Sequence, residues 1–210
     1  MQSRLLLTLC GLAAMAITAA LGRGPAAAQD PPKFGSVKSI TRQPDEFGDL
    51  AQALRIHKAV GGYELAAPPS RVRLRFDFYH QAGKVRSVAQ PIWIQSTADA
   101  PATSGRYAVH VIDLDFLPLG GAKPGQYRIH YQFAVAAARV ANSVDVPKAV
   151  FNAGRNMATQ SFRPGAAKPG EAPLAAFVGN ATSFRPFASP EEVVQGNPTS
   201  DVLVVVLEYQ

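Results

Sequence analysis

The four histidines of this sequence are candidates for catalysis or metal binding, because imidazole is both a proton carrier and a common metal ligand. They are His57, His80, His110 and His130. None has the HxH or HxxxH spacing of a local chelate, so only the fold could assemble a copper or zinc site from them. The candidates for such a site are His110, His130 and His80. The spacing favours ordinary surface or rim histidines, and we predict no metal and no cofactor.

Two acidic residues, Asp113 and Asp115, stand two positions apart and would share one face of an extended strand. Paired carboxylates can hydrolyse glycosides or bind Ca²⁺, but no aspartic-protease triplet and no calcium loop accompanies them. Serine-nucleophile and phosphate-loop motifs are also absent from the sequence. We therefore predict no catalytic residue. The two carboxylates are expected to meet water or to pair with Arg106 or Arg128.

A row of three arginines, Arg71, Arg73 and Arg75, alternates with apolar residues and so occupies one face of a strand. Like charges on one strand face repel each other unless carboxylates or an acidic partner lie across from them. This row is either an interaction face or a solvated face that discourages edge-to-edge aggregation.

Alternation of apolar and polar residues predicts the strands that would position these groups. It is clearest over residues 71–79, and it recurs at 106–114 and at 127–135. Another strand is expected around 91–95. The continuous apolar run at 201–209 predicts a final strand buried on both faces, at the centre of a sheet.

Two regions are harder to interpret. Residues 49–67 fit either a helix or a hairpin that turns at Gly61-Gly62, and the hairpin is slightly favoured. Residues 136–200 lose periodicity and are rich in proline, which predicts a long irregular region. Within it we expect short strands near 144–150 and 174–178, and a helical turn at residues 189–192 in which serine is the cap and proline takes the first helical position.

The stretch around Pro124-Gly125-Gln126-Tyr127 resembles the corner between strands E and F of immunoglobulin-like β-sandwiches. The resemblance covers about 20 residues. It implies that Tyr127 is the corner tyrosine and that Trp93 is a candidate for the core tryptophan, so both would be critical to the fold. The expected fold is an all-β, immunoglobulin-like antiparallel sandwich, and the resemblance carries no activity.

The amino-terminal segment has the charged start, apolar run and small-residue end of a secretory signal peptide. We expect cleavage after residue 28, an extended segment at 29–48 and a single sandwich domain at 49–210. Cleavage would remove Cys10, the only cysteine, together with Arg4 and Arg23, so the chain's 21 basic and 15 acidic residues would leave a net charge of +4. The exported chain would have no disulfide and no membrane span.

These features favour a periplasmic or secreted binding or accessory protein without catalytic activity. Its partner would be a protein of the cell envelope rather than nucleic acid, because the basic residues are dispersed along the chain. One alternative is a periplasmic protein that binds a small ligand or a metal in a pocket beside the irregular region. A second alternative is a hydrolase whose catalytic groups only the fold brings together.

Overall fold

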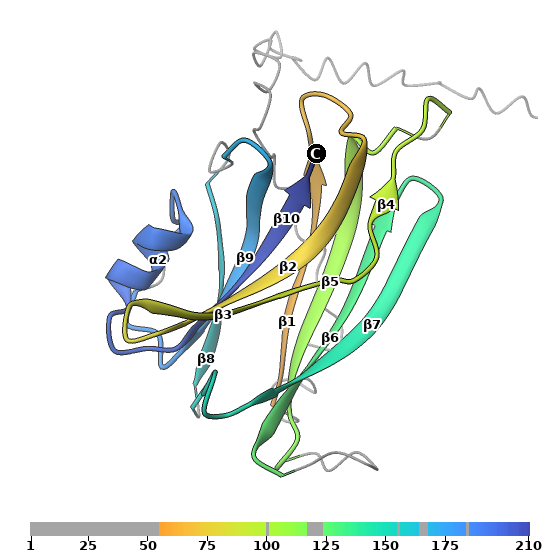
Figure 1. Ribbon diagram of the computed structural model, residues 1–210. Coiled ribbons are helices and arrows are strands. Elements are labelled where there is room, and N and C mark those ends of the chain that lie inside the picture. The colour runs from red at the N-terminus through yellow and green to blue at the C-terminus, as the bar shows by residue number, and fades with distance from the viewer. Residues whose placement is uncertain (1–54, 100, 117–123, 155, 164–167, 184) are drawn as a thin grey trace, which may run out of the picture. The chain divides into compact units, whose positions relative to one another are not determined.

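The computed structural model describes residues 55–99, 101–116, 124–154, 156–163, 168–183 and 185–210, and most of these residues lie in strands (Figure 1). In chain order the elements are β1 (Ile56–Glu64), β2 (Arg71–His80), β3 (Gly83–Ala89), β4 (Ile94–Gln95), β5 (Ser104–Asp113), β6 (Gln126–Val135), β7 (Ala138–Pro147), β8 (Met157–Ser161), β9 (Glu171–Gly179), α2 (Pro190–Gly196) and β10 (Val202–Tyr209). The expected signal peptide and the extended segment 29–48 lie outside the described residues.

The strands form two antiparallel sheets. One sheet has the order β1-β5-β6-β7, and the other has the order β3-β2-β10-β9-β8, with β4 also paired to β2. The sheets pack face to face: the Phe76 ring of β2 lies 5.1 Å from the Tyr131 ring of β6, and the Tyr107 hydroxyl of β5 donates to the Leu174 carbonyl of β9. An all-β sandwich is therefore confirmed. In the part of the chain that the structure describes, no helix is long and apolar enough to cross a membrane.

The alternating strands place their apolar rows in the interface between the sheets, as expected. In β2, Val72, Leu74, Phe76 and Phe78 are buried, while the arginines between them face outward. In β6 the row that begins at Tyr127 and ends at Val135 is buried in the same way. The predicted strand at 106–114 corresponds to β5. Of the strand expected at 91–95, only the two residues of β4 are present.

The final strand β10 lies between β2 and β9, which confirms the predicted central position. One of its faces, with Leu203, Val205 and Leu207, belongs to the core between the sheets. The opposite face, with Val202, Val204 and Val206, belongs to a second apolar cluster that Val193 and Val194 of α2 help to cover. The run from Val202 to Leu207 is apolar on both faces because the helix helps to remove the second face from water.

Helix α2 begins as predicted. Ser189 is the N-cap, its side chain accepts a hydrogen bond from the Glu192 amide, and Pro190 takes the first helical position.

Residues 136–200 are more regular than predicted: they hold β7, β8, β9 and α2. The short strands expected near 144–150 and 174–178 coincide with parts of β7 and β9. The expectation of a long irregular region around them was wrong because β7 and β8 lie at the edges of their sheets. An edge strand buries too little surface to need an apolar alternation.

The predicted hairpin turn at Gly61-Gly62 was also wrong, because β1 runs straight through both glycines. Glycine is needed here for close approach. Gly61 lies opposite Tyr107, and Tyr63 lies opposite Gly105, so each tyrosine ring covers the glycine of the other strand. A Cβ at position 61 would stand 2.8 Å from the Tyr107 hydroxyl oxygen.

Substitution of Gly105 by alanine is expected to destabilise the fold by about 1–3 kcal/mol, the usual range for overpacking. The added Cβ would stand 2.5 Å from both the Ala134 carbonyl oxygen and the Tyr63 hydroxyl oxygen, and the backbone oxygen cannot move aside cheaply. Urea unfolding measures the loss. The control is Gly83→Ala, whose Cβ comes no closer than 3.5 Å to the His80 carbonyl oxygen. Equal unfolding midpoints for the two variants would contradict this explanation.

The order of the strands differs from that of immunoglobulin domains, whose strands E and F lie in different sheets. Here β5 and β6 are neighbours in one sheet, with Asp113 directly opposite Tyr127. Tyr127 is buried against Phe151, at 5.7 Å between ring centroids, and its hydroxyl contacts the backbone of Ala153, which is downstream rather than upstream. Trp93 is half-buried and lies outside the core.

Candidate functional site

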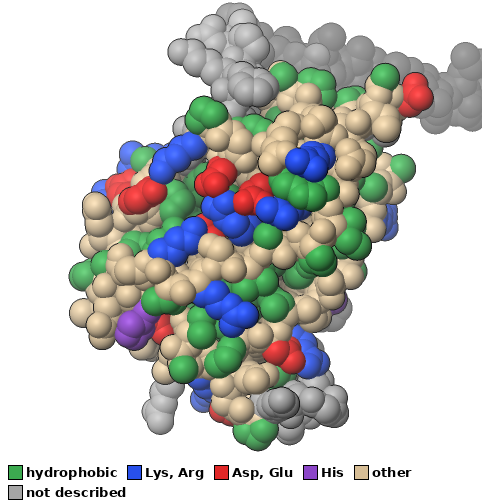
Figure 2. Space-filling view, viewed as in Figure 1, with side chains coloured by type: hydrophobic (Ala, Val, Ile, Leu, Met, Phe, Trp, Pro, Cys, Tyr) green, Lys and Arg blue, Asp and Glu red, His purple; other side chains and the backbone are tan. Residues whose placement is uncertain are grey.

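The three arginines of β2 lie on the outer face of the six-stranded sheet, where acidic side chains of neighbouring strands meet them. Arg73 and Arg75 both bind Glu208 of β10, and Arg71 binds the side-chain carbonyl of Gln210. The repulsion expected within the row is therefore relieved inside the chain. Figure 2 shows basic and acidic side chains mixed over this face.

Arg75 is the centre of the network. Its guanidinium donates two hydrogen bonds of 2.9 Å to Asp77 and bonds of 2.6 and 3.0 Å to Glu171, in addition to its bond to Glu208. The hydrogen bonds to Glu171, and then those to Asp77 and Glu208, raise the pKa of Arg75, although burial acts in the opposite direction. One cation thus holds three carboxylates that come from three adjacent strands.

Asp77 is the most deeply buried carboxylate of the network, since only 3% of its side chain is exposed. Besides Arg75, it accepts hydrogen bonds from the Ser87 hydroxyl at 2.6 Å and from the Lys84 ammonium at 2.9 Å. Burial raises its pKa, but the bonds from Arg75, Ser87 and Lys84 together lower it by more, so the net pKa lies below the ordinary value. Asp77 is ionised at neutral pH and fixes the position of both cations.

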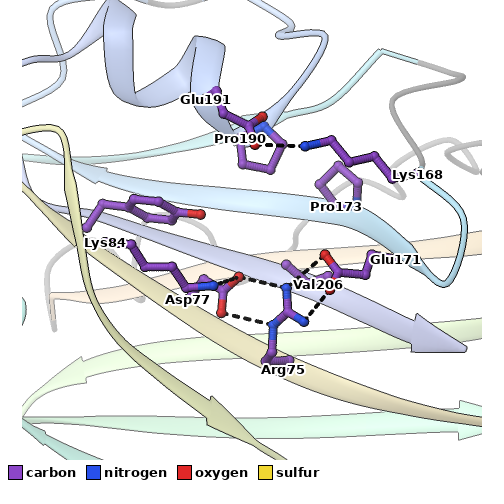
Figure 3. Close-up of a pocket in the computed structure, with 10 residues that line it drawn as sticks. Arg75, Asp77, Lys84, Lys168, Glu171, Pro173, Pro190, Glu191 and Val206 are labelled. Atoms are coloured by element: carbon purple, nitrogen blue, oxygen red, sulfur yellow. Dashed lines mark hydrogen bonds and ion pairs between the residues drawn. The ribbon is translucent and has the colours of Figure 1, made fainter.

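A hollow of about 300 Å³ opens beside this network, between the sheet and helix α2 (Figure 3). The lining residues come from β2, β3, β9, β10, α2 and the turn before β9: Arg75, Asp77, Tyr79, Lys84, Lys168, Glu171, Pro173, Pro190, Glu191 and Val206. Lys168 and Glu191 form an ion pair of 2.8 Å on the side of the hollow opposite Arg75 and Asp77. Both of its side chains are more than half exposed, so the pair can open at little cost.

Trp93 lies beside Arg71 and Arg73 on the same charged face and is not part of the lining of the hollow. The guanidinium carbons of Arg71 and Arg73 lie 4.7 and 4.3 Å from the centre of its ring. These distances are within cation–π range. Trp93 therefore orients two of the three arginines from outside the core.

The structure brings together two of the three histidine candidates. His110 and His130 face each other across β5 and β6 with their rings stacked at 6.1 Å, and His130 is hydrogen-bonded to the Ser143 hydroxyl. His80 lies elsewhere, 2.6 Å from Asp201. Burial lowers the pKa of His57. Among the described residues, no group of three or more His, Cys, Asp or Glu side chains is placed to hold a metal ion.

The two strand-end aspartates pair with a residue that the sequence did not suggest. Lys148 binds Asp113 at 2.8 Å and Asp115 at 2.9 Å, and its ammonium lies over the Tyr127 ring. The expected partner Arg128 instead binds Asp145. The prediction of Arg106 or Arg128 as partner was therefore wrong.

Sequence reasoning found the arginines but missed the carboxylates and lysines around the hollow. Glu208 carried a usable signal, because it is the only charged residue between Val202 and Tyr209. A charge within an otherwise buried strand needs a partner on a neighbouring strand. Glu171, Lys168 and Glu191 come from a region without readable periodicity, so only the fold shows that they meet.

Searches against protein-family models, curated proteins and solved structures find no match for this chain.

Proposed function

We propose that this chain is an exported, non-catalytic binding protein of the cell envelope, and that the charged hollow on its six-stranded sheet is the binding site. The proposal is carried by the fixed array of opposite charges around an open hollow: Arg75, Lys84 and Lys168 against Asp77, Glu171 and Glu191. Such an array can recognise a partner group that carries both signs of charge. Rigid strands hold most of these residues, so the site is preorganised.

The pKa values around the hollow favour binding over proton transfer. A general acid or base works best with a pKa near the operating pH. Here the hydrogen bonds from Arg75 lower the pKa of Glu171, and the bond from Lys168 lowers that of Glu191. The same bond to Glu191 raises the pKa of Lys168. The ion pairs thus shift the pKa of each of these groups away from neutral pH, so each group stays charged near pH 7.

Export to the periplasm is part of the proposal and is supported by the amino-terminal sequence. Residues 1–28 have the pattern of a cleavable signal, and the rest of the chain contains no cysteine. The packed core and the ion-pair network would then have to stabilise the exported protein without disulfides.

A small polar ligand is the second candidate for the occupant, and the size of the hollow favours it. Sites for small molecules start at about 300 Å³, and this hollow reaches that size. A ligand that carries an ammonium and a carboxylate group could displace the Lys168–Glu191 pair and bind both of its residues. A protein partner would instead present a charged loop to the same groups.

The test is recovery of the tagged full-length chain from its native envelope, followed by native mass spectrometry and identification of whatever is bound. The informative variant is Glu191→Lys, which replaces the rim ion pair with two cations. The matched control is Glu64→Lys, at an exposed carboxylate on the other sheet. We expect a bound ligand or envelope protein on the wild type and on the control, and about tenfold less on Glu191→Lys. A wild type without any bound species, or equal binding to all three proteins, would contradict the proposal.

A further inference from the structure

Strand β7 is a long, open edge of the four-stranded sheet (Figure 1). It runs for ten residues, from Ala138 to Pro147, and most of its side chains are exposed. On one side it pairs with β6 along its full length, and no described strand pairs with its other side. Its outer edge therefore presents backbone donors and acceptors to solvent, apart from the Ser143 amide, which donates to the Asn142 side chain at 2.8 Å.

The other sheet edges are protected in ways that β7 is not. The pairing of β3 with β2 contains a register shift, and β3 carries Lys84 and Arg86. Strand β8 is only five residues long. The edge strand β1 carries Lys58, and the Thr159 hydroxyl of β8 donates to the Lys58 carbonyl, so β8 covers part of the β1 edge. Bulges, positive charges, short strands and covering contacts are the usual defences against edge pairing. Strand β7 has regular pairing with β6 and a proline only at its last position, and its two charged residues, Arg139 and Asp145, have opposite signs.

The sequence of β7 would match a second, antiparallel copy of the same strand if the two copies crossed at Asn142. An antiparallel copy centred there places Arg139 opposite Asp145 and Val140 opposite Val144. Directly opposite residues of antiparallel strands lie on the same face and within contact distance. The symmetric arrangement therefore contains the Arg139–Asp145 contact twice and the Val140–Val144 contact twice.

We propose that a second copy of this chain pairs with β7 in this register, so that the two four-stranded sheets join into one sheet of eight strands. Asp145 is already held at 2.7 Å by Arg128, and its carboxylate can accept a further hydrogen bond from Arg139 of the partner copy. Val140 and Val144, which are partly buried, would gain cover from each other. The contact uses the same surface on both copies, so the assembly closes at a dimer.

The dimer is independent of the proposed binding function, because the hollow is on the other sheet. A two-fold axis through the Asn142 pair stands perpendicular to the joined sheet. The six-stranded sheets of the two copies then lie on the same side of the joined eight-stranded sheet. The two hollows would therefore open toward one side, where they could bind a repetitive or extended partner together.

The first test measures the molecular mass of the full chain by sedimentation from about 1 µM to about 1 mM, the range of weak to moderate association. The variant Arg139→Asp would turn both opposite-charge contacts into like-charge contacts, and we expect it to raise the dimer dissociation constant about tenfold. The control Arg106→Asp makes the same charge change at an exposed residue of β5, inside the sheet. It should dimerise like the wild type.

The second test reads the register directly with single cysteines in a Cys10→Ser background. In the symmetric pair Asn142 faces its own copy, with Cα atoms about 4.5–5.5 Å apart, a distance that a disulfide spans. Asn142→Cys should therefore form a covalent dimer under mild oxidation. Ala138→Cys, on the same strand, should not, because the two cysteines would be roughly 27 Å apart at about 3.4 Å per residue.

A dimer that weakens with Arg139→Asp and cross-links only through Asn142→Cys would establish the interface. The proposal is overturned if the chain stays monomeric at all concentrations, grows beyond a dimer, or cross-links equally through both cysteines. A stable dimer that Arg139→Asp leaves unchanged would likewise exclude this register. A foreign strand recovered on β7, with the chain itself monomeric, would assign the edge to a different partner.

Discussion

Deletion of β10, residues Val202–Tyr209, is expected to abolish cooperative folding. The strand forms the backbone ladder to both β2 and β9, and its side chains contribute to both apolar clusters. Each buried valine or leucine contributes about 1.5–3 kcal/mol. Six such residues together contribute as much as the whole free energy of unfolding of a domain, about 5–15 kcal/mol. Thermal unfolding followed by circular dichroism would show a broad, featureless change in place of a transition.

A milder variant separates the loss of this strand from a general effect of shortening the chain. Leu203→Ala keeps the ladder and removes one fully buried side chain, so it should cost about 2–5 kcal/mol and leave a cooperative transition at a lower temperature. If the deleted chain still melted sharply near the wild-type temperature, β10 would not be the strand that joins the two halves of its sheet.

The parts of the fold that could be predicted from the sequence are those in which one face of an element is exposed to solvent and the other is buried. Strand β2 shows this most clearly, because Arg71, Arg73 and Arg75 stay on the outer face while Val72 and Leu74 between them enter the core. The beginning of α2 was equally readable, because a serine cap followed by proline is a local signal that no distant contact needs to complete.

The sequence failed where long-range packing overrides the local pattern. Gly61-Gly62 has the composition of a turn, and only the Tyr107 ring across the sheet explains why a continuous strand needs glycine at position 61. Strand β8 and the first half of β7 were missed because exposed edge strands lack alternation. The immunoglobulin-like corner was suggested by a short turn motif, and such a motif does not determine which sheet receives the next strand.

Only part of the candidate site could be predicted from the sequence, again because long-range packing brings the rest together. A sequence shows that three arginines share a face, but it does not show what lies across from them. Glu208 and Glu171 lie 133 and 96 positions away from Arg75 along the chain, and only the pairing of β2, β10 and β9 brings them together. The expected repulsion thus became a network of ion pairs.

Replacement of Asp77 by asparagine is expected to destabilise the protein by about 3 kcal/mol, the lower end of the range for breaking a buried ion pair. Asparagine keeps the shape of the side chain but loses the charge that holds Arg75 and Lys84. The loss stays near the lower end because Arg75 retains Glu171 and Glu208. The control Glu191→Gln breaks an exposed pair beside the same hollow and should cost less than about 1 kcal/mol. Similar losses in the two variants, measured by urea unfolding, would show that burial of Asp77 does not determine the strength of the network.

The pH dependence of unfolding provides a separate readout of the same carboxylates. The folded-state pKa values of Asp77 and Glu171 are lowered, so their stabilising effect is fully present above the pKa values of the unfolded chain. This effect is lost as the pH falls through the folded values, because the unfolded chain then binds more protons than the folded one. We expect the melting temperature of the wild type to fall steadily as the pH drops from about 5 toward 2. In Asp77→Asn the fall should be shallower, since one of the carboxylates whose pKa is lowered no longer titrates. Parallel pH profiles would mean that Asp77 is not the group whose protonation weakens the fold.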